Sequence, residues 1–97
     1  MAQTIEIVRF HLNDGADRDQ FLAQNKDIEE NFINKQPGLI SRETAQNDEG
    51  EWMVVLHWQR PEDAQASMNK FVDAQETKKF TALIDMSTFT MARYAKA

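Results

Sequence analysis

Residues 51–64, Glu-Trp-Met-Val-Val-Leu-His-Trp-Gln-Arg-Pro-Glu-Asp-Ala, pass from a strand pattern directly into the start of a helix. The stretch 51–59 is rich in β-branched and aromatic residues, which predicts a strand. Pro61 suits the first position of a helix, and the acidic residues after it complement the helix dipole. We therefore expect a helix over about 61–75.

The rest of the chain supplies a partner for each of these elements. Asp17 is a credible helix N-cap, and Pro37 with Gly38 ends a helical pattern. The predicted elements are a strand over 3–12, a helix over about 18–36, a strand over 39–46, a helical piece over about 76–85 and a strand over 87–95. This β-α-β-β-α-β order predicts an α+β, ferredoxin-like fold with a four-stranded antiparallel sheet in the order 4-1-3-2. With no repeat or linker, residues 1–97 are expected to form a single domain.

Composition excludes several functions. The 97 residues include no cysteine, so thiol catalysis and thiolate metal sites are absent. The formal net charge is −5 and the basic residues are scattered, which argues against nucleic acid as a partner. The N-terminus has no signal-peptide pattern, and no stretch approaches the roughly 20 apolar residues of a membrane span. We expect a cytoplasmic protein that does not bind membranes.

Both faces of the predicted sheet carry apolar residues. Side chains alternate along a strand, and a half-exposed antiparallel sheet would show one polar face. The 51–59 strand instead has Trp52, Val54, Leu56 and Trp58 on one face and apolar residues on the other. Two helices cover only one face, so we expect a second copy to cover the other. The candidate residues of this homodimer interface are Ile7, Arg9, His11, Met53, Val55 and His57.

Three segments resemble the antibiotic-biosynthesis-monooxygenase family. They are the turn 13–15 after the first strand, the Gln-Pro-Gly-Leu-Ile-Ser stretch at 36–41 and the strand-to-helix passage at 56–64. The resemblance covers nearly the whole chain and implies a ferredoxin-like unit that pairs into a dimeric α/β barrel. It also implies one of several activities: cofactor-free oxidation of quinols, haem degradation, or conversion of small oxygenated metabolites.

The residues distinguish among these activities only partly. The haem-degrading members use a tryptophan and a histidine after the third strand, and residues 61–85 contain neither. We therefore expect no cofactor. The quinol monooxygenases keep a tryptophan that Trp58 matches. At three other positions of the quinol pattern this chain departs, with Val54, Ala64 and Lys78.

A small-molecule pocket is expected between sheet and helices, with Trp58, Asn25, Phe21, Leu56 and Phe71 as candidate lining residues. Trp58 has two interpretations: a wall that stacks a flat substrate, or a core residue whose indole N–H bonds a nearby carbonyl. Asn25 either orients a ligand or lies at the edge of its helix stripe and reaches water. Catalytic residues cannot be named from the sequence.

Three further polar residues have open roles. His11 and His57 are expected on neighbouring strands and the same face, either as polar packing in the interface or as a paired titratable site. Without carboxylates at metal spacing they predict no metal site. Glu6 is either a buried general base or an exposed residue at a strand end.

The leading hypothesis is a cofactor-independent monooxygenase acting on a small aromatic or quinol-type substrate. There are two alternatives. One is a non-catalytic protein that binds a small ligand or is related to stress, and the other is an isomerase or degrader of a small oxygenated metabolite.

Overall fold

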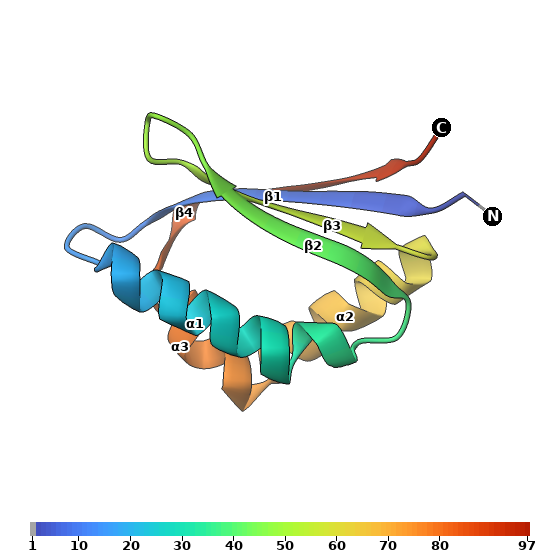
Figure 1. The fold of residues 1–97 in the computed structure, drawn as a ribbon, viewed down its shortest axis with the longest axis horizontal. Helices are drawn as coiled ribbons and strands as arrows, with labels where there is room; N and C mark the ends of the chain where they lie inside the picture. Colours follow the sequence, from blue (N-terminus) through green and yellow to red (C-terminus); the bar gives the residue numbers. More distant parts are fainter. Residues whose placement is uncertain (1) are drawn as a thin grey trace.

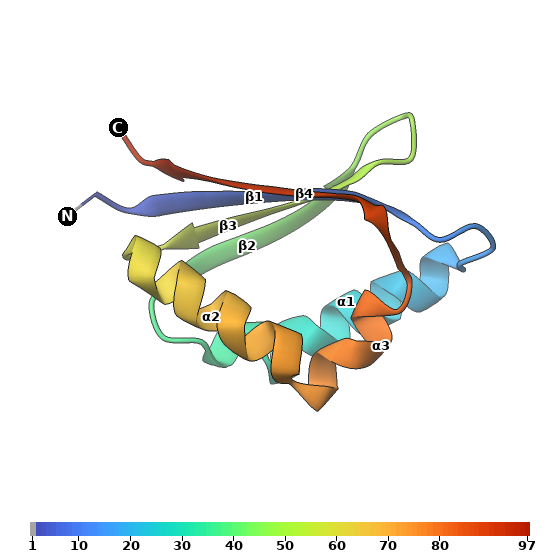
Figure 2. The same cartoon turned by 180° about the vertical axis from the view of Figure 1, so that it is seen from behind.

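The computed structural model describes residues 2–97 and contains one sheet with helices on one face only (Figures 1 and 2). The strands are β1 Thr4–Leu12, β2 Leu39–Gln46, β3 Trp52–Trp58 and β4 Ile84–Ala95, and the α-helices are α1 Arg18–Asn31, α2 Pro61–Asp73 and α3 Lys78–Thr81. The sheet is antiparallel with the order β2-β3-β1-β4. The ferredoxin-like fold and the predicted strand order are therefore confirmed.

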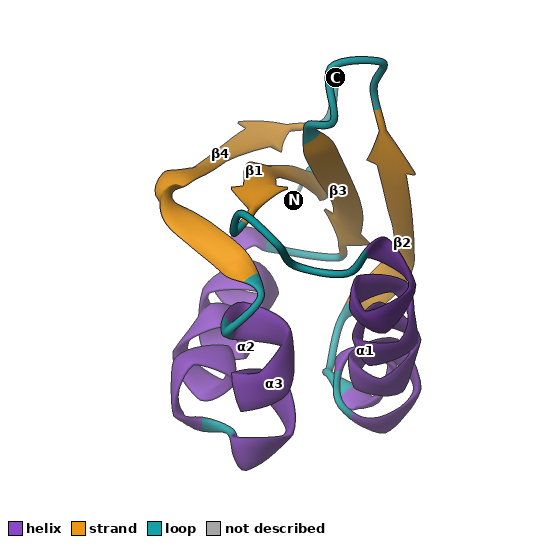
Figure 3. Cartoon of the chain, turned by 90° about the vertical axis from the view of Figure 1, so that its left-hand side faces the viewer, coloured by secondary structure: helices purple, strands orange, loops and turns teal. Residues whose placement is uncertain are grey.

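The helices on this face lie in two groups under different parts of the sheet. In the view along the strands, α1 lies below β2, whereas α2 and α3 lie below β4 (Figure 3). Within the described residues no helix is long and apolar enough to cross a membrane.

The first helix begins as predicted but ends earlier. The Asp17 side chain accepts a hydrogen bond from the Asp19 backbone N–H at 3.2 Å, so Asp17 is the N-cap. Phe32 leaves the helical conformation with φ −130°, and the chain continues as a 3-10 turn over Ile33–Lys35. Gly38 then takes φ +84°, where a Cβ would overlap the Asp63 side chain. The predicted helix of 18–36 is thus a helix and a separate turn.

The segment before the last strand also differs from the prediction. A single helical piece over 76–85 was expected, but a 3-10 turn at Gln75–Thr77 precedes the short α3, and β4 begins at Ile84. Ile84 pairs with Leu12, and the β1–β4 register then shifts between Arg9 and His11. At this irregularity the Thr88 hydroxyl accepts a hydrogen bond from the His11 N–H. Strand pairing at the end of β1 therefore overrides the local helical pattern.

One end of the space between sheet and helices is filled by aromatic rings. Phe21 is fully buried, 4.6 Å from Trp52 and 5.3 Å from Phe80 between ring centroids. Phe10 lies edge-on to Phe21 at 5.8 Å. This cluster ties α1 to the sheet and to α3.

We predict that Phe21→Ala destabilises the protein by about 3–5 kcal/mol, because it removes a fully buried ring from a packed cluster. Urea denaturation followed by circular dichroism measures this loss. Leu22→Ala is the matched control, since Leu22 is 36% exposed on the same helix and should cost less than about 1 kcal/mol. Equal losses in the two variants would contradict the packing described.

Candidate functional site

A cavity of about 280 Å³ lies between the sheet and the helices. Its lining is mostly apolar, and its aromatic side chains are those of Trp58, Phe10, Phe71, Phe80 and Phe89. Val72 and Met86 also line it and are 59% and 53% exposed, so the cavity opens to solvent between α2 and the start of β4. Its volume is close to the lower limit of about 300 Å³ for small-molecule sites.

The structure places three of the five candidate pocket residues at this cavity. Trp58, Leu56 and Phe71 line it. Phe21 does not, because it lies in the aromatic cluster at the other end of the sheet, packed on Trp52. Asn25 does not line the cavity either, since its amide is bonded to the neighbouring strand. Phe21 and Asn25, which were expected to line a pocket, thus lie outside this cavity.

Glu6 is the acidic residue of the cavity wall, and it is only 3% exposed. The Trp58 indole N–H donates to its Oε1 at 3.3 Å, and Arg93 Nε donates to its Oε2 at 2.7 Å. Of the two alternatives for Glu6, burial is therefore the one observed, and exposure at a strand end is wrong. The indole hydrogen bond exists, but its acceptor is a carboxylate instead of a backbone carbonyl.

Strand register explains this arrangement. Glu6 of β1 lies opposite Leu56 of β3 on one side and Arg93 of β4 on the other. Cross-strand neighbours have side chains on the same face, so the carboxylate and the guanidinium meet beneath the sheet. Arg93 also donates to Gln65 of α2 at 2.8 Å and so connects the sheet to that helix. Sequence alternation could indicate the face of Glu6 but not its partner on β4.

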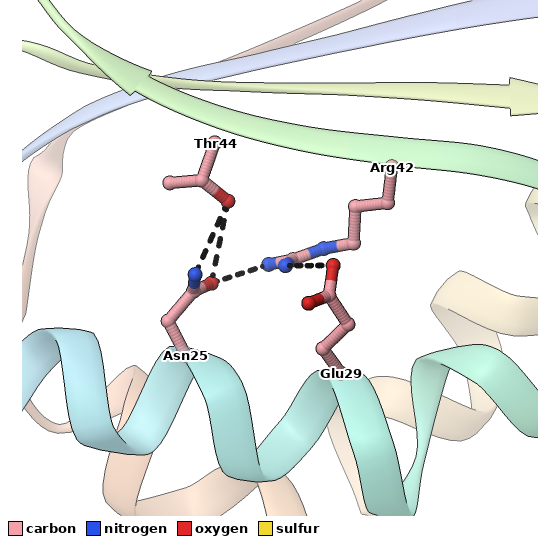
Figure 4. Close-up of polar contacts among 4 residues, drawn as sticks. All are labelled: Asn25, Glu29, Arg42 and Thr44. Carbon is pink, nitrogen blue, oxygen red and sulfur yellow. Dashed lines mark hydrogen bonds and ion pairs between the residues drawn. The ribbon is translucent and has the colours of Figure 1, made fainter.

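Arg42 is the functional candidate that sequence reasoning missed. Its side chain is 4% exposed and lines the cavity. Figure 4 shows it reaching from β2 to α1, where Nη2 donates to Asn25 Oδ1 at 2.7 Å and Nη1 to Glu29 Oε1 at 3.4 Å. Burial lowers the pKa of the Arg42 guanidinium below its ordinary value, and Glu29 partly offsets this effect. Asn25 is half-buried and also bonds Thr44, so it orients Arg42 and does not reach freely into water.

An irregularity in β2 explains why the inward orientation of Arg42 could not be predicted from the sequence. Leu39 packs against the core, so simple alternation would place Ser41 on the inner face and Arg42 on the outer face. The register shifts between Leu39 and Ser41, and Arg42 therefore points inward opposite Leu56.

The two histidines lie on the outer face, away from the cavity. His57 is opposite Ile5, whereas His11 is near the far end of β1, opposite Asp85. His11 is six positions along β1 from Ile5, a distance of about 20 Å. Within one chain they do not form the paired titratable site considered above. Among residues 2–97 no group of three or more histidine or acidic side chains could hold a metal ion.

Comparisons with known proteins support the fold. No protein-family model matches the sequence, and no curated protein matches it. Solved structures match over the full length. SnoaB of Streptomyces nogalater, a cofactor-independent oxygenase, has a TM-score of 0.81 at 11% identity, covering 100% of this chain and 95% of SnoaB. A proposed antibiotic biosynthesis monooxygenase of Bordetella bronchiseptica has a TM-score of 0.80 at 15% identity, covering 100% and 99%. A proposed monooxygenase of the same kind from Chloroflexus aurantiacus has a TM-score of 0.71 at 16% identity, covering 99% and 94%. The chain thus shares the fold of antibiotic biosynthesis monooxygenases, and the resemblance inferred from its sequence is confirmed at that level.

Proposed function

We propose that this protein is a cofactor-independent monooxygenase whose cavity binds a small aromatic, quinol-type substrate. The observation that carries the proposal is an apolar, aromatic-walled cavity with one deeply buried carboxylate, Glu6, in its wall. The fold shared with SnoaB is consistent with this activity but does not identify a substrate.

In the proposed reaction Glu6 is the general base. Each of its oxygens accepts one hydrogen bond from the protein, and a carboxylate oxygen has a further lone pair for a substrate proton. The fixed contacts to Trp58 and Arg93 hold the carboxylate in place without a solvent shell. Trp58 provides both an aromatic wall and the hydrogen bond that orients the base.

The proposed reaction needs only dioxygen as a co-reactant. An anthrone-type substrate gives a proton from its reacting CH₂ carbon to Glu6, and the carbanion passes an electron to dioxygen. The two radicals combine into a peroxide on that carbon. Cleavage of the O–O bond leaves a carbonyl, and the distal oxygen departs as water with the proton that Glu6 returns and the second hydrogen of the carbon. The protein's contribution is to bind, deprotonate and exclude water.

We also propose that the outer face of the sheet pairs with a second copy. Ile7 lies opposite Val55 on this face and both are half-buried in the single chain, while Met53 is 37% and Tyr94 57% exposed. The helices lie on the other face of the sheet (Figure 3), so a self-complementary contact on this face would remove these side chains from water.

The activity test is oxygen uptake with a panel of anthrones and naphthoquinols. We expect protein-dependent uptake that falls by about 100-fold or more in Glu6→Gln, because a general base contributes at least that factor. Trp58→Phe should reduce uptake by about tenfold, since it makes the aromatic wall smaller and removes the hydrogen bond to the base. Circular dichroism verifies that each variant is folded at the assay temperature.

Trp52→Phe is the matched control for Trp58→Phe. Trp52 is 3% exposed, like Trp58 a buried tryptophan of β3, but it does not line the cavity. It should lower the melting temperature and leave uptake unchanged. Saturable binding of the panel without uptake would reject the monooxygenase and favour the ligand-binding alternative. The absence of both binding and uptake would reject the cavity as a ligand site.

The dimer prediction uses a charge placed at the middle of the outer face. Light scattering at micromolar concentration should give twice the 11.2 kDa chain mass for the unaltered protein. Val55→Glu should give the monomer mass, because it buries an unpaired charge in the contact. Ala66→Glu, at an exposed position of α2, should remain dimeric. A monomeric unaltered protein would refute the interface.

A further inference from the structure

The charged residues that line the cavity differ in how closely they are paired with an opposite charge. Two lining residues are basic, Arg42 and Lys78, and one is acidic, Glu6. Glu6 has a close partner, Arg93, at 2.7 Å. Lys78 is exposed and donates to the backbone carbonyl of Val72. Arg42 is the buried cation of the cavity wall. The partners of its guanidinium therefore influence which ligands the cavity can bind.

The acidic partner of Arg42 compensates its charge weakly. Glu29 Oε1 is 3.4 Å from Nη1, a long contact for an ion pair, and the Glu29 side chain is 36% exposed. The shorter contact, at 2.7 Å, goes to the neutral amide of Asn25. Nη1 and Nη2 each make one hydrogen bond within the described residues, although each carries two N–H groups. A buried cation in this state gains from an anion that enters the cavity.

The rigidity of the cluster favours such binding. Asn25 bonds both Arg42 and Thr44, so α1 and β2 hold the guanidinium between them (Figure 4). A preorganised cation loses little side-chain freedom when it binds an anion. Arg42 and Glu6 flank Leu56 in the same cross-strand row, at a Cα spacing of about 10 Å.

We propose that the ligand of the cavity is an aromatic molecule that carries an anionic group of the carboxylate type, and that Arg42 binds this group. The inference deepens the proposed function and rests on the same cavity. With the anionic end at Arg42, the ring lies over Leu56 against Trp58, and the far edge of the ring faces Glu6. Arg42 is then the residue that selects acidic over neutral aromatics, and Glu29 limits its affinity.

The test is calorimetric titration with 2-naphthoate and with its neutral counterpart of similar shape, 2-naphthamide. We expect saturable binding of naphthoate and binding of naphthamide that is about tenfold weaker. Arg42→Gln should reduce naphthoate affinity by about tenfold and leave naphthamide affinity unchanged. Arg60→Gln is the control, because Arg60 also pairs with a carboxylate but is exposed and outside the cavity lining.

Glu29→Gln distinguishes ligand binding from a purely structural role of the cluster. Glutamine retains an acceptor for Arg42 but removes the competing charge, so naphthoate should bind about threefold more tightly. Glu30→Gln, which removes the same charge from an exposed position of α1, should leave affinity unchanged. A role in stability alone predicts no tightening.

The outcomes separate this inference from the proposed function. Equal binding of naphthoate and naphthamide overturns the role of Arg42 and leaves the aromatic cavity intact. A preference for naphthoate that survives Arg42→Gln, or that Glu29→Gln weakens, also overturns it. Absence of binding by both probes overturns the inference and the ligand site on which the proposed function rests.

Discussion

The burial of the Glu6 carboxylate is the constraint on which the site depends. A carboxylate that is 3% exposed is strongly destabilising unless charged and polar donors surround it. Trp58 from β3 and Arg93 from β4 supply those donors, and Arg93 also bonds Gln65 of α2. Satisfying one side chain therefore fixes the relative positions of three strands and a helix. Removal of either donor would leave a buried charge incompletely bonded.

A row that contains three charged residues crosses the inner face of the sheet. It runs from Arg42 of β2 past Leu56 and Glu6 to Arg93 of β4, so each edge strand contributes an arginine that reaches the helix below it. The aromatic cluster around Phe21 fills the space toward one end of the sheet, whereas the cavity over this row is left unfilled. A packed aromatic cluster and an open cavity therefore lie next to each other between the sheet and the helices.

Much of this arrangement could be predicted from strand alternation and helix signals, and the failures have local causes. The period-two pattern of 51–59 correctly placed Leu56 and Trp58 on the helix side, and Asp17 and Pro61 marked helix starts. Arg42 was missed because a register shift in β2 reverses the faces of the residues that follow it. Helical spacing predicts the face on which Phe21 lies but not its position along the sheet, so it cannot distinguish the aromatic cluster from the pocket. The partner of Glu6 depends on pairing between the first and last strands, which no local pattern encodes.

The two tryptophans allow a direct test of the central claim that the cavity beside Glu6 is the ligand site. In a ¹H–¹⁵N spectrum each indole N–H gives one signal, and Trp52→Phe assigns them. On anaerobic titration with 1,4-naphthoquinol, we expect a saturable shift of the Trp58 signal, because this N–H bonds Glu6 at the cavity wall. The Trp52 signal should stay nearly constant. A shift confined to Trp52, equal shifts of both signals, or no shift at saturating quinol would show that the cavity beside Glu6 is not the ligand site.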